Sequence, residues 1–178
     1  MIANLLTSIR LVLALPVAWA CAEADAFPSY FLILLIVVAI ATDYFDGKVA
    51  RHMKTASAGG MLFDHGTDFI FVTSALFAAS YAGLVVPWLP MLIVLAFSQY
   101  VLDSYWLLRQ KQLRMSMLGR WNGVLYFSPL VLIGLAQLDI LNSWSAPLHS
   151  LIMLLSIVLV LSTLASIVDR AIAPLRAR

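Results

Sequence analysis

The chain has 178 residues, of which 63% are hydrophobic and only 11% are charged, and its formal net charge is +2. Soluble domains carry about 25% charged residues, so this composition excludes a soluble protein and indicates an integral membrane protein. The basic residues are few and scattered between apolar runs, which argues against a nucleic-acid-binding surface, and the single cysteine, Cys21, cannot form an intrachain disulfide.

Six apolar segments follow one another along the chain, and each approaches the roughly 20 residues that a membrane-spanning helix needs. In chain order they are Leu5–Ala22, Ser29–Phe45, Met61–Val86, Trp88–Leu108, Trp121–Leu138 and Pro147–Ile167. The connectors between them are short. We therefore predict an all-α membrane protein with six transmembrane helices, forming a single domain over residues 1–178.

The first segment also permits a second interpretation. Arg10 is followed by LVLALPVAWACA, in which Ala18 and Ala20 form the A-x-A pattern of a signal-peptide cleavage site. Cleavage there would leave an odd number of helices and place the new N-terminus outside. We therefore favour a first helix that is retained.

Lysine and arginine are concentrated in alternate connectors, which predicts the orientation of the chain. The basic residues of these regions are Lys48, Arg51, Lys54, Arg109, Lys111, Arg114, Arg120, Arg170, Arg176 and Arg178. The opposite connectors contain Glu23, Asp25, Asp139 and Asn142 but no lysine or arginine. The positive-inside rule then places both termini in the cytoplasm, as in a multi-pass protein of a bacterial inner membrane.

The stretch TDYFDGKVARHMKTASAGGMLFDHGTD, residues 42–68, carries four aspartates at the edges of the second and third segments: Asp43, Asp46, Asp64 and Asp68. If the two helices are joined by a turn near Thr55, all four lie at a similar depth. Spacings of three and four residues put each pair on one helix face. Carboxylates gathered in this way repel one another unless cations compensate them. They could hold two hard divalent cations about 3.5–4 Å apart, so we predict a site for two Mg²⁺ or Mn²⁺ ions on the cytoplasmic side.

Other interpretations of the aspartates remain open. They could form a structural salt-bridge network with Lys48, Arg51 and Lys54. They could also mark an ion pathway, as acidic residues inside membranes often do. In that case the chain is a noncatalytic or transport protein with an acidic cation site.

The same stretch reads D-x-x-D-G-x-x-A-R and, after eight further residues, G-x-x-x-D-x-x-x-D. This pattern resembles the signature of the CDP-alcohol phosphatidyltransferase family, whose fixed positions here are Asp43, Asp46, Gly47, Ala50, Arg51, Gly60, Asp64 and Asp68. The six-helix layout and the chain length are also similar to that family. The resemblance implies a homodimeric membrane enzyme of phospholipid synthesis that moves a phosphatidyl or other substituted phosphoryl group from a CDP-linked alcohol to an acceptor hydroxyl, releasing CMP.

The resemblance also implies roles for the matching residues. Asp43, Asp46 and Asp64 would hold the metal ions, and Asp68 would be the fourth ligand or the general base that accepts the proton of the attacking hydroxyl. His65 is not a fixed position of the signature. Because it is next to Asp64, it could be a further ligand or a hydrogen-bond donor to a ligand, or it packs at the surface.

Further matching positions are assigned to the nucleotide. Gly47 and Ala50 would let it lie against the helix, Arg51 would bind a phosphate, and Gly60 would permit close approach of the returning helix. The alternatives are packing for the glycines and membrane anchoring for Arg51.

The start of the chain, NLLTSIR, resembles an N-x-x-T-x-x-R pattern seen at the start of family members. Asn4, Thr7 and Arg10 share one broad helix face and could contact the CDP group. The alternative is an interfacial anchor for the first helix.

The sequence indicates the acceptor substrate less directly than it indicates the metal site. Asp103 lies on a polar stripe of the fourth segment and, with Arg109 and Arg120, could bind an anionic acceptor such as glycerol 3-phosphate or an inositol phosphate, with CDP-diacylglycerol as donor. However, FDHGTDF departs from the L-D-P-x-x-D-K typical of relatives that use glycerol phosphate. It is closer to the branch that transfers from CDP-choline or CDP-ethanolamine to diacylglycerol, and both interpretations stay open.

Overall fold

The computed structural model describes residues 2–52, 58–103 and 117–176, and within these ranges it leaves out the side chains of residues 2–6, 46–47, 49–52, 58–59, 61 and 173–176. The described residues form α-helices and short 3₁₀ turns without any strand, so the predicted all-α fold is confirmed. The helices are α1 (Ile2–Ala22), α2 (Phe31–His52), α3 (Ala58–Tyr81), α4 (Trp88–Leu102), α5 (Met117–Leu125), α6 (Phe127–Ala136) and α7 (Ser145–Arg176).

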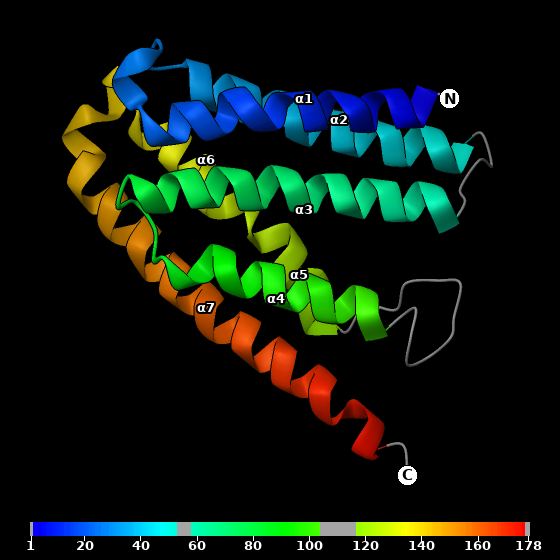
Figure 1. Cartoon of the computed structure of the whole chain (residues 1–178). Helices are drawn as coiled ribbons and strands as arrows, with labels where there is room; N and C mark the ends of the chain where they lie inside the picture. The colour runs from blue at the N-terminus through cyan, green and yellow to red at the C-terminus, as the bar shows by residue number, and fades with distance from the viewer. Residues whose placement is uncertain (1, 53–57, 104–116, 177–178) are drawn as a thin grey trace.

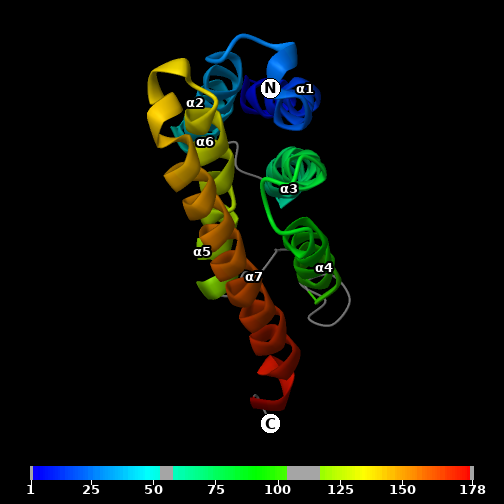
Figure 2. The same cartoon turned by 90° about the vertical axis from the view of Figure 1, so that its left-hand side faces the viewer.

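The helices stand in two rows (Figure 2), with α1, α3 and α4 in one row and α2, α6, α5 and α7 in the other. α1 packs against both α2 and α3, and α7 packs against α4, α5 and α6. The start of α1, the end of α2, the start of α3 and the end of α4 lie at the same end of the bundle (Figure 1). This arrangement brings the two halves of the aspartate motif to one end of the protein.

Close contacts between helices are made by small and buried side chains. Ala14 on α1 and Ala75 on α3 are almost fully buried, as is usual where membrane helices approach closely. On α6, Gly134 lies against α2, where a Cβ would come within 3.1 Å of the Ile33 Cα. The central core also contains Phe71.

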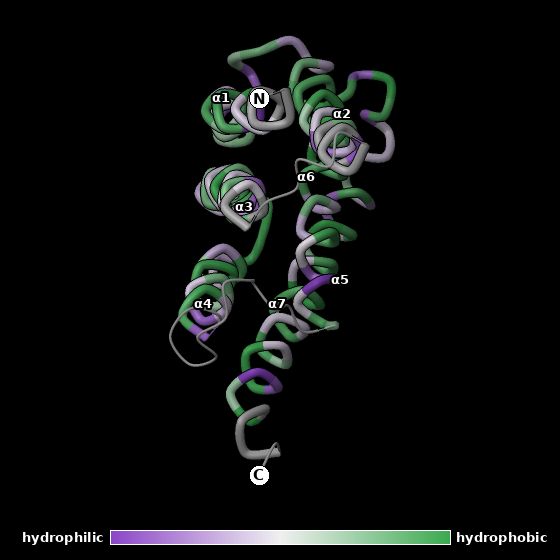
Figure 3. Tube along the Cα trace, turned by 90° about the vertical axis from the view of Figure 1, so that its right-hand side faces the viewer, coloured by the Kyte–Doolittle hydropathy of each residue, from purple (hydrophilic) through white to green (hydrophobic). Residues whose placement is uncertain are grey.

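Most residues along the helices are hydrophobic, as the colouring of Figure 3 shows, and many large apolar side chains are exposed. Leu15 on α1 is 79% exposed and Val12 is 71% exposed. Large apolar side chains exposed on several helices fit a protein surrounded by lipid. By length and hydropathy, the segment Asp139–Ile172 is the one described helix able to cross a membrane, and Thr7–Ala22, Phe31–Phe45 and Trp88–Leu102 are shorter apolar helices.

The predicted end of the third segment was wrong. α3 ends at Tyr81 rather than at Val86, because Gly83 adopts a left-handed conformation with φ of 74°. The Leu84 N–H donates to the Ala79 carbonyl at 2.9 Å. This is the common glycine-terminated end of a helix.

The predicted fifth segment, Trp121–Leu138, is also not one continuous helix. It is divided at Tyr126 into α5 and α6. Pro129 has no N–H to donate to the Leu125 carbonyl, and the hydroxyl of Ser128 donates to that carbonyl instead. The end predicted for the fourth segment, Leu108, lies outside the described residues.

Candidate active site

Arg10 is the centre of the aspartate cluster. Its side chain is completely buried, and its guanidinium contacts carboxylates from two other helices. Nη1 lies 2.5 Å from Oδ1 of Asp43 on α2, and Nη2 lies 2.5 Å from Oδ1 of Asp64 on α3. Nη1 also pairs with Oδ1 of Asp68 on α3. One guanidinium therefore joins α1, α2 and α3 at this end of the bundle.

Helical periodicity explains why Arg10 and the two aspartates of α3 lie on the faces where their helices pack together. Thr7, Arg10, Ala14 and Val17 are all buried and recur every three or four residues, so Arg10 lies on the face of α1 that packs into the bundle. On α3, the four-residue spacing of the two aspartates puts them on one face. A buried arginine on a packing face is costly unless it is paired, and three carboxylates supply the pairing.

The structure thus brings together three of the four predicted aspartates. The side chain of Asp46 lies outside the described atoms, although its backbone belongs to α2. The midpoint assumed for the turn, Thr55, also lies outside the described residues. The described carboxylates pair with Arg10. Of the three cations named in the salt-bridge alternative, the side chain of Arg51 and the whole of Lys54 lie outside the described atoms. The described Lys48 places its Nζ 5.9 Å from the ring centroid of Tyr44.

The donor atoms at this position suit a divalent cation. One ligand atom from each of Asp64, His65 and Asp68 lies within 4.8 Å of the others. These side chains are partly exposed rather than sealed, so an ion can reach them. Carboxylate oxygens are the preferred ligands of Mg²⁺ and Mn²⁺, and an imidazole nitrogen is an accepted additional ligand for transition metals. His65, a secondary candidate in the sequence, belongs to this group.

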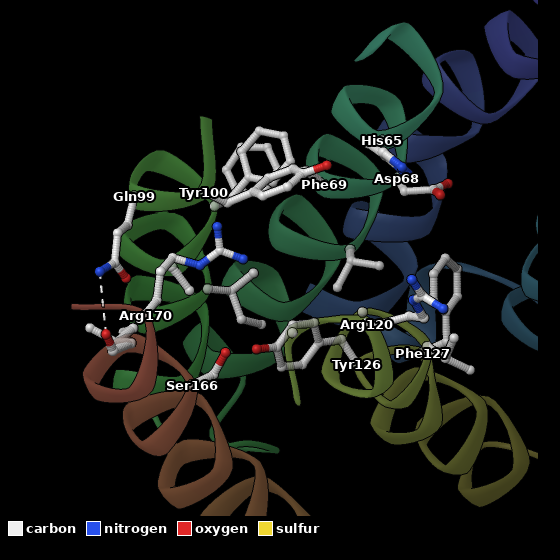
Figure 4. A pocket seen from close by; sticks show the side chains of 18 of the residues that line it. His65, Asp68, Phe69, Gln99, Tyr100, Arg120, Tyr126, Phe127, Ser166 and Arg170 are labelled. Carbon is white, nitrogen blue, oxygen red and sulfur yellow. Dashed lines mark hydrogen bonds between the residues drawn. The ribbon is translucent and has the colours of Figure 1, made fainter. Parts of the chain in front are cut away.

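A cavity of about 520 Å³ extends from the aspartates into the bundle (Figure 4). Asp43, His65 and Asp68 line one part of it. Most of the remaining wall is apolar and is contributed by Ile40, Phe69, Val72, Ile93, Ala96, Phe97, Val124, Phe127 and Ile167. The rings of Phe69 and Phe97 are stacked with their centroids 4.2 Å apart, which joins α3 to α4 along this wall.

Two arginines also line the cavity. Arg120, on α5, was predicted as an acceptor ligand, and Figure 4 shows it near Phe127. Arg170, on α7, was used in the sequence only for orientation. Its Nη1 lies 4.0 Å from Oδ2 of Asp103, and its guanidinium carbon lies 5.1 Å from the ring centroid of Tyr100.

Among the other predicted acceptor residues, Asp103 lies beside the cavity through its contact with Arg170. Arg109 lies outside the described residues. Gln99, from the same polar stripe, lines the cavity and donates from Nε2 to the Ile167 carbonyl at 3.2 Å. The described part of the stripe, Gln99 and Asp103, therefore faces the cavity side of α4, as polar stripes of membrane helices usually do.

Asn122 joins α5 to α7. It is buried on α5, and its Oδ1 accepts a hydrogen bond of 2.6 Å from Ser162 on α7. Nearby, the hydroxyls of Tyr126 and Thr163 are 2.8 Å apart. These polar contacts hold α5 against α7.

Two of the residues predicted to bind the nucleotide are described, and each lies one helical turn along the chain from a residue of the cluster. Thr7 is buried one turn before Arg10, and Gly60 is half-buried one turn before Asp64. The described atoms do not include the side chains of Asn4, Ala50 and Arg51 or the contacts of Gly47.

Comparison with known proteins matches the family predicted from the aspartate motif. The CDP-alcohol phosphatidyltransferase profile matches residues 1–168, which is nearly the whole chain. No curated protein and no solved structure matches the chain in the same comparisons. The family consists of integral membrane enzymes that are in general metal-dependent. The chain therefore belongs to the CDP-alcohol phosphatidyltransferase family and is a transferase of substituted phosphate groups.

Proposed function

We propose that the protein transfers a phosphatidyl group from CDP-diacylglycerol to the hydroxyl of a small polar acceptor and releases CMP. The observation that carries this proposal is the convergence of Asp43, Asp64 and Asp68 at one part of a large, mainly apolar cavity. Acidic ligands beside an apolar chamber are suited to a substrate that has a charged pyrophosphate and lipid chains.

The aspartates would hold two divalent cations. Asp43, Asp46 and Asp64 would be ligands, and His65 is a further candidate on α3. When bound, Mg²⁺ or Mn²⁺ would neutralise the pyrophosphate and the charge that develops on departing CMP.

Asp68 is the candidate general base. It lines the cavity and is partly exposed, so an acceptor hydroxyl can approach its carboxylate. In the proposed reaction the acceptor oxygen bonds to the β-phosphorus, the bond from that phosphorus to the CMP oxygen breaks, and Asp68 takes the hydroxyl proton. Thr7 and Gly60, one turn from the cluster, lie where the nucleotide would contact α1 and α3, together with the predicted Asn4, Gly47, Ala50 and Arg51.

Two cavity arginines support an anionic acceptor such as glycerol 3-phosphate or an inositol phosphate. Arg120 and Arg170 both line the chamber that contains Asp68. A guanidinium binds a phosphate through two parallel hydrogen bonds, which orients as well as attracts it. Asp103 would position Arg170 through their contact, and Arg109 remains a candidate from the sequence.

A second candidate function rests on the apolar wall of the same cavity. Nine apolar side chains line it, and such a wall would also accept diacylglycerol. In that case CDP-choline or CDP-ethanolamine would be the donor. The departure of FDHGTDF from the motif of glycerophosphate-using relatives favours the same alternative.

The arrangement in the membrane is part of the proposal. We place six spans in the bilayer, with α5 and α6 together forming the fifth, and both termini on the cytoplasmic side of a bacterial inner membrane. The asymmetry of lysine and arginine supports this orientation. The whole chain would act as one domain, and the family resemblance supports a homodimer.

A matrix of donors and acceptors tests the function. The purified protein is incubated with Mg²⁺, with CDP-diacylglycerol or CDP-aminoalcohols as donors, and with phosphorylated polyols or diacylglycerol as acceptors. We expect CMP release and a new lipid mass with CDP-diacylglycerol and a phosphorylated polyol. Product formed from CDP-choline or CDP-ethanolamine with diacylglycerol would establish the alternative, and no product in any pairing would contradict both.

A further inference from the structure

Arg10 occupies the position that the cations would need, and its geometry is unusual for a structural ion pair. Its side chain has no exposed surface, yet it contacts three carboxylates. All three contacts use the Oδ1 atoms of Asp43, Asp64 and Asp68, the same groups that the proposed function assigns to metal ions or proton transfer. The guanidinium is therefore placed among the cation ligands rather than beside them.

The charges explain why an arginine is found there. Three carboxylates carry three negative charges, and in the absence of cations they would repel one another. A planar guanidinium with several N–H donors can pair with more than one carboxylate at a time. Arg10 is thus the internal counter-ion that keeps α1, α2 and α3 together when the cluster holds no cation.

The same contacts oppose cation binding. Mg²⁺ binds its oxygen ligands at about 2.0–2.1 Å, whereas Nη1 and Nη2 already lie 2.5 Å from the Oδ1 atoms of Asp43 and Asp64. Binding through these oxygens would bring the ion into contact with the guanidinium. Binding through the Oδ2 atoms would still place the cation within a few ångströms of the positively charged guanidinium, where the repulsion between them is strong.

We propose that Arg10 is a built-in competitor of the divalent cations: it neutralises the aspartates in the cation-free protein, leaves them when the ions bind, and so sets the affinity of the site for cations. This inference rests on the proposed cation site. It makes Arg10 a positioning residue whose removal strengthens cation binding. A purely structural anchor would leave the affinity of the folded protein unchanged.

The test is the dissociation constant for Mn²⁺, measured on the purified full-length protein by electron paramagnetic resonance of free Mn²⁺, without substrates. Arg10→Met removes the charge and keeps an unbranched side chain. We expect Mn²⁺ to bind this variant on the order of tenfold more tightly than it binds the wild type, because the competing charge is gone. Thermal unfolding provides a second readout: Arg10→Met should be less stable than the wild type with EDTA and should gain more stability on adding Mn²⁺.

Arg170→Met is the matched control. It removes the same charge from the wall of the same cavity, but Arg170 pairs with Asp103, and Figure 4 shows it well apart from Asp68. We expect its Mn²⁺ affinity to change by less than about threefold, since only the longer-range charge is lost. A gain as large as that of Arg10→Met would mean that general charge, not direct competition, controls the affinity, and would overturn the inference.

The outcomes separate the inference from the proposed function. Mn²⁺ binding that is equal or weaker in Arg10→Met overturns the inference and leaves the cation site standing. Failure of the wild type to bind Mn²⁺ overturns both. If Arg10→Met does not fold, Arg10→Lys carries the test, because an ammonium cannot bridge three carboxylates as a guanidinium can. We expect Arg10→Lys to bind Mn²⁺ more tightly than the wild type does. An unchanged affinity would contradict the proposal that Arg10 competes with the cations.

Discussion

At the scale of single residues, the three described aspartates do not have the same surroundings. Asp64, His65 and Asp68 belong to one candidate ligand group. Asp43 is the most exposed of the three, with 48% of its side chain accessible, whereas Asp68 is 28% exposed. Asp43 and Asp68 also line the cavity, so they face the space that substrates would enter. Asp68 therefore belongs both to the candidate ligand group and to the cavity wall, and the proposed division between metal ligands and a base rests on its role.

Substitution of Asp68 by asparagine tests that division. Asn keeps the shape of the side chain but cannot accept the proton of the acceptor hydroxyl. If Asp68 is the general base, kcat should fall by about 10²–10⁴-fold, while binding of the CDP-linked donor changes much less. Both quantities are measured on one preparation, by CMP release and by equilibrium donor binding.

Asp43→Asn is the comparison variant for this experiment. It removes a proposed metal ligand, so cation affinity, donor binding and kcat should decrease together. The same joint decrease in Asp68→Asn would make Asp68 chiefly a ligand. Unchanged turnover in Asp68→Asn would contradict both roles.

The sequence predicted the aspartates but not their partner. Spacings of three and four residues within a helix determine which side chains share a face, and this was enough to group the acidic residues. Arg10 was recognised only as part of an N-x-x-T-x-x-R pattern. Its pairing with Asp43 and Asp64 depends on which helices are neighbours, and periodicity within one helix carries no information about that. Arg170 was missed as a cavity residue for the same reason.

At the scale of the helices, the apolar segments predicted the elements well and their breaks poorly. The starts of α4 and α7 agree with the sequence to within two residues, because prolines and loss of hydropathy mark them. The end of α3 depends on the backbone conformation of Gly83. The division between α5 and α6 depends on one proline inside an apolar run. Hydropathy does not register either feature.

Gly83→Ala tests the importance of the α3 terminus. The φ of Gly83 is 74°, and the position has no atom within 4 Å of an added Cβ, so the expected penalty comes from the backbone alone. Forcing an L-residue into this conformation costs roughly 1–2 kcal/mol. We expect a loss of unfolding free energy of about that size, measured by denaturation in detergent.

Gly66→Ala is the matched control on the same helix. An added Cβ at Gly66 also meets no atom within 4 Å, but the residue is helical. Alanine favours a helix over glycine by about 1 kcal/mol, so this variant should be as stable as the wild type or more stable. A Gly83→Ala variant that behaves like Gly66→Ala would show that the left-handed turn is not required.

At the scale of the whole molecule, the charges and the apolar surface are segregated. Arg10 and its three aspartates lie in the half of the bundle where α1 and α3 begin and α2 ends, and large apolar side chains such as Leu15 are exposed on the outside. The family and the composition together predicted this design, since an apolar exterior requires the charged chemistry to be gathered inside or at an end. The cavity could not be predicted, because it depends on how α3, α4, α5 and α7 pack.

Removal of divalent cations should therefore stop the reaction while the helical bundle persists. Arg10 remains to neutralise the carboxylates after chelation, so we expect helical content by circular dichroism to be unchanged in excess EDTA. CMP release should disappear because the developing charge on the leaving group loses its stabilisation, and Mg²⁺ or Mn²⁺ in excess over the chelator should restore it. Full activity after exhaustive chelation would contradict metal-dependent transfer. Irreversible loss of helical signal would instead show that Arg10 is unable to hold the cluster without cations.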